Sequence, residues 1–350
     1  MFLADYSLEQ LNNILKDIGE PSFRAKQLFL ASHSYKIYEE MTNIPKTLRE
    51  KLKMKEIFDI PVKIIKTLES KDGTKKFLFE LFDGNVIEGV LMKYKYGYTQ
   101  CVSTQVGCRM HCAFCASGLN GLVRNLSAGE ILGQILAVNK MLDGGLEDKR
   151  KITNVVLMGS GEPLDNYDNV VAFLRNVSAT GGINISPRNI SLSTCGLVPK
   201  IYDLAKENLS VNLTISLHSP FDDERKKIMP VANAYSIKQI LDACTNYFKE
   251  TGRRYIFEYV LINGNNNLKR HADELIKLLS GRPCHINLIR LNSVKENDLK
   301  AVSEQEAYKF MGLLTKAGLS ATLRRQMGVD IDGACGQLRQ KYLKEEQKGD

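Results

Sequence analysis

Three cysteine thiols lie within eight residues of one another, in the stretch Cys108-Arg-Met-His-Cys112-Ala-Phe-Cys115. Thiolates are soft ligands that favour iron-sulfur clusters or zinc. Three thiolates on one short loop can bind only three corners of a cubane cluster, which leaves the fourth iron open to another ligand. Gly107, directly before the first thiol, allows the tight turn that wrapping a cluster requires. The spacing therefore predicts a 4Fe-4S cluster held by Cys108, Cys112 and Cys115.

A structural zinc site is the alternative interpretation of the thiol loop. Zinc sites usually complete four ligands with a second Cys or His pair at short spacing, and the other cysteines of this chain stand singly. The iron-sulfur interpretation is therefore favoured. His111, inside the loop, is expected to be solvated or to neighbour the ligands. Cys195, Cys244 and Cys284 are expected to be inert buried thiols.

The length of the chain suits a large α/β protein, and its positive net charge is compatible with an anionic partner. It has 350 residues, eight cysteines and a net charge of +8. There is no apolar run long enough to cross a bilayer and no signal-peptide pattern at the start, so a cytoplasmic location with reduced thiols and no membrane partner is expected. The positive charge suits RNA, but lysines and arginines alternate with nearly as many acids and can also simply solvate the surface.

The first part of the chain changes from helical to strand periodicity near residue 61. Ser7-Leu-Glu-Gln10 has the form of a capping box, and apolar residues recur at helical spacing through Ile18. Two more helices are expected over 23–31 and from Pro45 onwards. Period-2 patterns then predict strands at 62–68, 75–82 and 86–92, with Asp83-Gly84 as a hairpin turn.

From residue 98 onwards, predicted strands and helices alternate. Strands are expected at 98–105, 152–158, 190–194, 211–217, 255–262, 285–291 and 321–325, and helices at 127–141, 166–176, 236–250, 268–279 and 303–317. Such alternation predicts a parallel sheet closed into a partial (β/α)6 barrel with six or seven strands. The predicted units are a helical accessory domain at 1–60 that contacts RNA, a β-hairpin extension at 61–95, the barrel at 96–327 and a C-terminal segment at 328–350.

In β/α barrels the chemistry lies where strands end, so the residues at these positions are candidates for ligand contact. Each one alone could equally cap its strand. The candidates are Gly161 and Glu162 after the second core strand, Ser193 at the third, Ser216, Leu217 and His218 at the fourth, and Asn292. Glu162 could accept hydrogen bonds from an ammonium group.

Two solitary cysteines have unusual settings. Cys335 is flanked by small residues in Asp-Ile-Asp-Gly-Ala-Cys335-Gly-Gln-Leu, where it is poorly suited to core packing. Cys101 lies in the strand before the thiol loop, so that it faces the same end of the barrel. Either could still be an inert buried thiol.

Taken together, the thiol loop, Cys101-Val-Ser-Thr-Gln-Val-Gly-Cys108, Arg124-Asn-Leu126, Gly-Glu-Pro163, Ser-Leu-His218 and the Cys335 segment resemble the RlmN/Cfr family of radical S-adenosylmethionine (SAM) RNA adenosine methyltransferases. The resemblance covers essentially the whole chain. Pro163 and the residues that follow it resemble the RlmN branch, whereas Ser219 and Arg290 resemble Cfr. The RlmN branch is favoured.

The resemblance implies a fold of the radical SAM type and a cluster whose open iron binds SAM. It implies that Gly161, Glu162, Ser193, Ser216, Leu217, His218 and Asn292 bind that cofactor. It further implies that Cys335 accepts a methyl group from SAM, and that a radical from a second SAM activates this methyl for addition to adenine. Cys101 then resolves the adduct through a transient disulfide with Cys335, and Glu88 removes the ring proton. Without the resemblance, Glu88 would be read as a solvent-facing strand residue.

The implied substrates are an adenosine in the peptidyl transferase centre of 23S rRNA and the adenosine next to some tRNA anticodons. The RlmN branch methylates carbon 2. Methylation of carbon 8, as in Cfr enzymes that confer antibiotic resistance, is the alternative. The resemblance also requires an external one-electron reductant, and a monomer is expected. Two interpretations from other classes stay open, namely a non-catalytic metal-cluster RNA-binding protein and a radical enzyme acting on a small molecule.

Overall fold

The computed structural model describes residues 1–292, 299–331, 338–339 and 341–342. Within these residues, one sheet holds ten strands in the order β1-β2-β3-β4-β7-β8-β9-β10-β11-β12, and β5 and β6 form a separate pair. The strands are β1 (Val62–Glu69), β2 (Lys75–Leu81), β3 (Val86–Tyr94), β4 (Gly97–Cys101), β5 (Gln105–Gly107), β6 (Leu122–Asn125), β7 (Ile152–Leu157), β8 (Ile190–Thr194), β9 (Asn212–Ser216), β10 (Tyr255–Leu261), β11 (Cys284–Arg290) and β12 (Ala321–Leu323).

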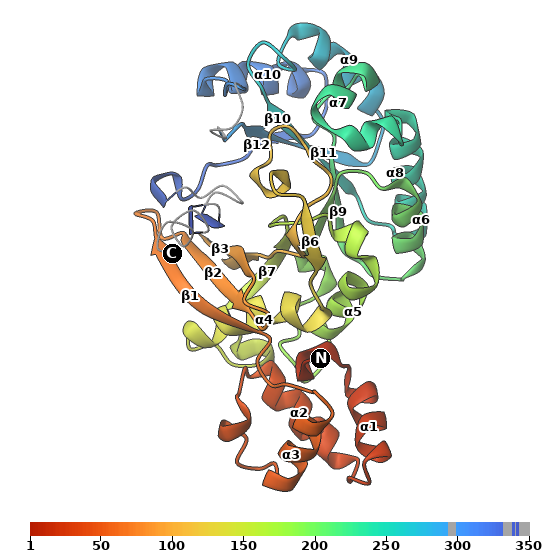
Figure 1. Cartoon of the computed structure of the whole chain (residues 1–350). Helices are drawn as coiled ribbons and strands as arrows, with labels where there is room; N and C mark the ends of the chain where they lie inside the picture. Colours follow the sequence, from red (N-terminus) through yellow and green to blue (C-terminus); the bar gives the residue numbers. More distant parts are fainter. Residues whose placement is uncertain (293–298, 332–337, 340, 343–350) are drawn as a thin grey trace.

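The strands from β4 to β12 in this sheet are parallel and follow one another without reversal of order, which confirms the predicted α/β partial barrel. Six strands and a short seventh, β12, build it. Figure 1 shows the later helices wrapped around the outer side of these strands. The helices of the barrel are α4 (Ala128–Met141), α5 (Tyr167–Val177), α6 (Val198–Lys206), α7 (Asp222–Ile228), α8 (Ile237–Thr251), α9 (Lys269–Leu279) and α10 (Glu304–Lys316).

The strands β1 to β3 extend the barrel sheet in the antiparallel sense, because β3 pairs with β4. In this register Val90 lies opposite Cys101. One face of the extension, with Phe77 and Phe79, belongs to the main core that also includes residues of α4. The other face carries Val90 and Met92, which cluster with Cys101. Successive side chains of β3 therefore point alternately into the main core and toward the interior of the partial barrel.

The first helices, α1 (Leu8–Asp17), α2 (Phe23–His33) and α3 (Lys46–Met54), pack around a hydrophobic cluster of their own. Figure 1 shows them below the barrel, away from its upper strands. The predicted capping box is present, since Gln10 N donates to Ser7 Oγ over 3.2 Å and Ser7 N donates to Gln10 Oε1 over 2.8 Å. Polar contacts join these helices to the barrel, such as Ile183 N to His33 Nδ1 at 3.2 Å.

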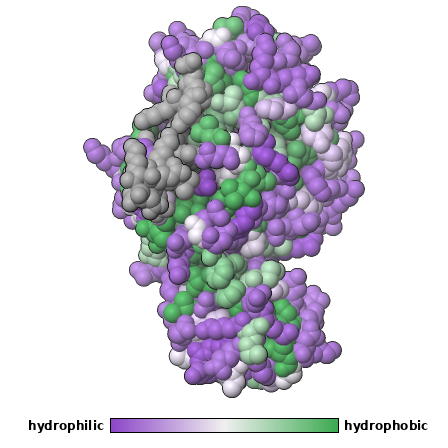
Figure 2. All heavy atoms as spheres, in the orientation of Figure 1, coloured by the Kyte–Doolittle hydropathy of each residue, from purple (hydrophilic) through white to green (hydrophobic). Residues whose placement is uncertain are grey.

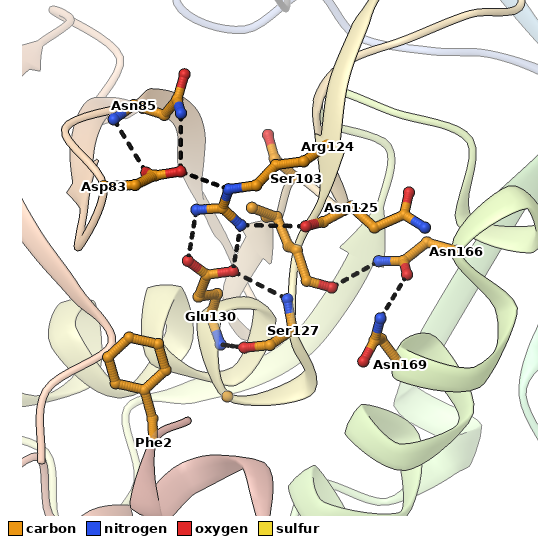
Figure 3. A network of polar contacts seen from close by, with 12 residues as sticks. Phe2, Asp83, Asn85, Ser103, Arg124, Asn125, Ser127, Glu130, Asn166 and Asn169 are labelled. Carbon is orange, nitrogen blue, oxygen red and sulfur yellow. Dashed lines mark hydrogen bonds and ion pairs between the residues drawn. The ribbon is translucent and has the colours of Figure 1, made fainter. Parts of the chain in front are cut away.

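Arg124 on β6 fixes the pair β5–β6 against its surroundings (Figure 3). Its guanidinium donates to both carboxylate oxygens of Glu130 at 2.8 and 2.9 Å, and to Asp83 Oδ2 at 2.6 Å. Asp83 lies in the β2–β3 turn and Glu130 in the first turn of α4. The Arg124 guanidinium holds the pKa of the Asp83 carboxyl well below its usual range. Because β5 and β6 flank the thiol loop, this network holds both ends of that loop.

Two parts of the sequence prediction differ from the structure. The strand expected at 98–105 ends at Cys101, and β5 is a separate strand that pairs with β6. Helices α6 and α7 were not predicted. In α6 the apolar residues Val198, Ile201 and Leu204 do have helical spacing, so a signal was present. In α7 six of the seven residues are charged, as in Asp-Asp-Glu-Arg-Lys-Lys-Ile, and no apolar periodicity marks the helix.

Among the described residues, no helix combines the length and the apolar character that crossing a bilayer requires.

Candidate active site

The thiol loop, which contains Cys108, Cys112 and Cys115, connects β5 to β6 at the mouth of the partial barrel. Gly107 has a φ of +79°, and a Cβ there would lie 2.0 Å from Gly121 O, so the turn requires glycine as predicted. Cys108 N donates to Gly121 O over 2.9 Å and closes the loop. Ala113 N donates to Ile228 O over 2.9 Å, which ties the loop to α7. His111 is exposed.

The three thiols line a cavity of about 260 Å³ at the strand ends. Hydrophobic side chains gather in the middle of this face of the molecule, whereas the outer helices present mainly hydrophilic ones (Figure 2). The predicted cofactor residues that also line the cavity are Gly161, Glu162, Ser193, Ser216, His218 and Asn292. Leu217 does not line it. It is fully buried in the barrel core, because neighbouring residues on a strand point to opposite faces.

Glu162 is a buried carboxyl held in place by backbone groups. Its Oε2 accepts from Cys195 N at 2.7 Å and its Oε1 from Leu164 N at 3.0 Å. Burial raises the pKa of Glu162, and these hydrogen bonds oppose that effect. The preceding Gly161 has a φ of +108°, and a Cβ there would lie 2.6 Å from Gln105 Cβ. A cationic ligand group in the cavity would therefore meet a buried carboxyl and favour its ionised form.

His218 presents a neutral imidazole to the cavity. Val260 N donates to its Nδ1 over 3.0 Å, which places the ring proton on Nε2. Burial, and secondly the charge of Arg225, lower the pKa of His218 to about 3. Phe114 of the thiol loop packs edge-on against the imidazole, with ring centroids 4.7 Å apart. His218 can thus donate one hydrogen bond to a ligand and hold the loop in position.

The electrostatics of the thiols fit a metal cluster. Burial raises the pKa of Cys108 to about 12 and raises that of Cys112 further, so these groups need a neighbouring positive charge to become thiolates. Within the described residues, no three His, Cys, Asp or Glu side chains are gathered as ligands of a single ion. Three thiolates on a cubane bind three different irons.

Cys101 lines a second cavity of about 150 Å³ beside the first. Its other lining residues are Val90, Met92, Met158, Ile289, Arg290, Asn292, Arg324, Arg325, Gln326 and Met327. Met158, Ile289, Arg290 and Asn292 line both cavities. The structure therefore brings Cys101 next to the thiol cavity, with one shared wall between them.

Glu88 is buried, so the solvent-facing alternative for it is wrong. It lies two residues before Val90 on β3, so both side chains are on the same face of the strand. Its carboxylate pairs with the fully buried Lys76 at 3.3 Å and accepts a hydrogen bond from Arg339 N. Glu88 lines neither cavity. Cys335 lies outside the described residues, but Glu88 contacts the backbone only four residues beyond it.

Several cavity residues were missed by the sequence reasoning. Glu258 on β10 is 7% exposed, and burial raises its pKa although Arg324 Nη1 lies 3.6 Å from its Oε1. Glu258 is the one acidic residue of the apolar strand Tyr-Ile-Phe-Glu-Tyr-Val-Leu, and this exception in the pattern could have marked it as a candidate site residue. Cys195, expected to be inert, is buried but lines the thiol cavity.

Two family models match this chain. The model of the Radical SAM superfamily matches residues 102–279, and that of the ribosomal RNA large subunit methyltransferase N-terminal domain matches residues 1–58. A relative in Clostridium perfringens (strain SM101 / Type A), named "Probable dual-specificity RNA methyltransferase RlmN", is 52% identical over 98% of this chain and 97% of its own length. The chain belongs to the RlmN family of radical SAM RNA methyltransferases.

Further similar proteins agree with the RlmN assignment. A protein of the same name in Clostridium tetani (strain Massachusetts / E88) is 48% identical over 99% of this chain and 98% of its own length. The crystal structure of a radical SAM methyltransferase from Sphaerobacter thermophilus superimposes with a TM-score of 0.91 and 42% identity, over 96% of this chain and 98% of that one. The predicted family, RlmN branch, fold and enzyme class are confirmed. As a radical SAM enzyme the chain uses a 4Fe-4S cluster and SAM.

Proposed function

We propose that this chain methylates carbon 2 of an adenosine in 23S rRNA and of the adenosine next to the anticodon in some tRNAs. The dual specificity in the names of the relatives supports two RNA classes. The observation that carries the proposal is the shared wall between the thiol cavity and the Cys101 cavity. Because Met158, Ile289, Arg290 and Asn292 line both cavities, a reactive group made in the first lies close to Cys101 in the second.

In this proposal the thiol cavity is the cofactor site. Cys108, Cys112 and Cys115 bind the cluster, and Glu162 accepts hydrogen bonds from the SAM ammonium group. Ser193, Ser216, His218 and Asn292 offer hydroxyl, imidazole and amide groups to its remaining polar atoms. When bound, the cluster and SAM supply one-electron cleavage of SAM to a radical that abstracts hydrogen. An external one-electron reductant supplies the electron, and the chain acts as a monomer.

The two solitary cysteines carry the methyl group to the RNA. The Cys335 thiolate attacks the methyl carbon of one SAM, forming a sulfur–carbon bond while S-adenosylhomocysteine leaves. After hydrogen abstraction, the methylene radical on Cys335 would add to adenine carbon 2, a position without a lone pair that could attack a sulfonium. The adduct would give up the ring proton and one electron, which returns to the one-electron carrier that started the reaction. The Cys101 thiolate then attacks the Cys335 sulfur, which forms a disulfide and breaks the bond between that sulfur and the methylene carbon. This carbon takes up a proton and leaves as the methyl group of the base. The position of Cys101 beside the thiol cavity supports this role.

Glu88 is proposed to accept the proton that leaves the adenine ring. Its carboxylate lies on the Cys101 side of β3 and contacts the backbone of Arg339, near the Cys335 segment in the sequence. Lys76 Nζ lies 3.3 Å from Glu88 Oε2, and this ion pair holds the carboxylate in position.

RNA would enter from the side of the Cys101 cavity, where Arg290, Arg324 and Arg325 gather. Guanidinium groups suit phosphate oxygens, and a target base must leave its stack to reach a cavity of this size. The helical unit 1–60 matches a ribosomal RNA methyltransferase domain and is proposed as a second RNA contact.

Mass spectrometry of adenosines from RNA treated with the reconstituted protein tests the proposal. We expect 2-methyladenosine from both 23S rRNA and tRNA. Methylation of carbon 8 would instead support the Cfr-type alternative. If no methylated adenosine forms from either RNA although the protein holds iron and sulfide and receives SAM and reductant, the proposed substrates are wrong.

The Cys101→Ala variant tests the resolving role separately. We expect it to accumulate a covalent adduct between protein and RNA, because no thiol is left to attack Cys335. Cys244→Ala, which removes a fully buried thiol on α8, is the control and should turn over freely. Free turnover by Cys101→Ala would remove the role of Cys101.

A further inference from the structure

Arg225, on α7, is a fully enclosed guanidinium with an exposed fraction of 0%. Its Nη2 donates to Cys195 O at 2.7 Å and Ser216 O at 3.1 Å, and its Nε donates to Leu217 O at 3.1 Å. These carbonyls lie where β8 and β9 end. Its Nη1 is buried and has no hydrogen-bond partner among the described residues. The side chain thus bridges two strand ends directly beside the cofactor cavity.

Only neutral carbonyls accept the hydrogen bonds of Arg225 among the described residues. Asp222, in the first turn of the same helix, acts on its charge through space, while the Oδ1 of Asp222 accepts from Ile237 N. Arg109, in the thiol loop, is the opposite case. Its side chain is 59% exposed and pairs with Asp165 through both Nε and Nη2. Burying a cation without an anion is strongly unfavourable, so a fully buried arginine implies a compensating negative charge nearby.

The surroundings of Arg225 indicate where this anion lies. Helix α7 contacts the thiol loop through the bond from Ala113 N to Ile228 O, and Cys195, which accepts from Arg225, lines the same cavity as Cys112. Arg225 does not itself line the cavity, but its guanidinium is hydrogen-bonded to the carbonyl of Cys195, which does. Its positive charge therefore lies directly behind the wall of the thiol cavity.

We propose that Arg225 is the buried counter-cation of the thiolate-bound cluster and raises its reduction potential. A cubane with three thiolates is anionic, and one electron from the external reductant makes it more negative. A buried cation stabilises the reduced form more than the oxidised form. Arg225 is thus a positioning residue that acts through charge and makes electron entry easier. The proposal depends on the cluster but on neither RNA nor Cys335, so it can fail while the proposed methylation stands.

Potentiometric titration of the reconstituted protein, followed by electron paramagnetic resonance, tests this role without any turnover. Arg225→Gln keeps donors for the strand-end carbonyls but removes the charge, and Arg225→Lys keeps the charge. At the midpoint potential of the unsubstituted protein, we expect the ratio of reduced to oxidised cluster to fall at least tenfold in Arg225→Gln. For a one-electron couple this equals a shift of about 59 mV to more negative potential. Arg225→Lys should stay within threefold.

Arg109→Gln is the matched control, because it removes the same charge from an exposed and paired arginine on the thiol loop itself. We expect its ratio to change less than twofold, since solvent screens that charge. An unchanged potential in Arg225→Gln, or an equal shift in Arg109→Gln, would overturn the proposal.

Loss of the cluster in Arg225→Gln is also informative. If the cluster-free variant unfolds at the same temperature as the cluster-free unsubstituted protein and Arg225→Lys still binds iron, the missing charge alone explains the loss, which supports the proposal. If both variants are unfolded without the cluster, the role of Arg225 is structural and the proposal is wrong.

Discussion

The two adjoining cavities of the barrel have opposite chemical character. Arg290 lines both cavities, but the rest of the thiol cavity includes three thiols and the buried carboxyls Glu162 and Glu258, whereas the rest of the Cys101 cavity includes Arg324 and Arg325. SAM carries an ammonium and a sulfonium, while RNA carries a phosphate at every nucleotide. If SAM and RNA occupy the two cavities as proposed, the carboxyls face the cationic cofactor and Arg324 and Arg325 face the anionic substrate.

The largest effect that the comparison predicts comes from breaking the thiol cavity. Cys112→Ala removes one of the three proposed ligands, so we expect loss of the cluster and of all methylation, measured as iron content and methylated adenosine. RNA affinity should stay unchanged, because the Cys101 cavity keeps its arginines. Cys244→Ala is the matched control and should retain both iron and activity. A Cys112→Ala protein with full iron content would contradict the assigned ligand set.

A pH effect on stability should arise outside both cavities. Burial lowers the pKa of His33 from 6.5 to about 4 in the folded protein. Between these values the unfolded chain binds a proton that the folded chain does not, so stability falls as pH falls from 6.5 to 4 and is fully present above 6.5. The loss is about 3 kcal/mol.

Denaturant unfolding at several pH values measures the contribution of His33. His33→Gln keeps an acceptor for Ile183 N but cannot be protonated, so this part of the pH dependence should disappear. Neither cluster content nor RNA affinity should change at neutral pH. If the variant keeps the full pH dependence, the proton binds elsewhere.

Within the thiol cavity, Glu162→Gln should weaken SAM binding by roughly tenfold to a hundredfold, because charge-assisted hydrogen bonds contribute about 1.5–3 kcal/mol. Equilibrium binding of SAM to the reconstituted protein measures this. RNA affinity should not change. Glu207→Gln, at the end of α6 on the outer helical layer, removes the same charge and should leave SAM binding intact. Equal weakening in both variants would show that overall charge governs SAM binding.

The smallest effect is expected from the arginine wall. Arg325 is exposed, and Arg325→Gln should reduce the slope of log affinity against log salt for single-stranded RNA by about 0.7. SAM binding should be unaffected. Arg188→Gln, an exposed arginine before β8 at the opposite end of the barrel, is the matched control. The same slope in Arg325→Gln as in the unsubstituted protein would place the RNA elsewhere.

The sequence was sufficient to find most of the thiol cavity, because its residues follow local rules. Cysteine spacing predicted three thiols that line one cavity, and the carboxyl ends of parallel strands must meet at one edge, which brings Glu162, Ser193 and His218 to the same cavity. Leu217 differs from the other predicted cofactor residues, because its side chain is buried in the barrel core, as the alternation between Ser216 and His218 indicates. Its contact with the cofactor stays a prediction.

The Cys101 cavity could not be predicted because it depends on long-range pairing. Its wall includes Val90 and Met92, which reach Cys101 only through the antiparallel register of β3 on β4. Arg324 directly follows β12, the strand at the opposite edge of the sheet from β1. Arg225 was also missed, since it lies in a short and highly charged helix that reads as a solvated surface.

The most direct test of the central claim uses SAM with a labelled methyl group. If the two cavities act in sequence, label appears first in the peptide that contains Cys335 and then, after RNA and reductant are added, in adenosine. Cys335→Ala should carry no label and transfer none. Transfer of label to RNA by Cys335→Ala at the rate of the unsubstituted protein, or no label in either place, would contradict the account.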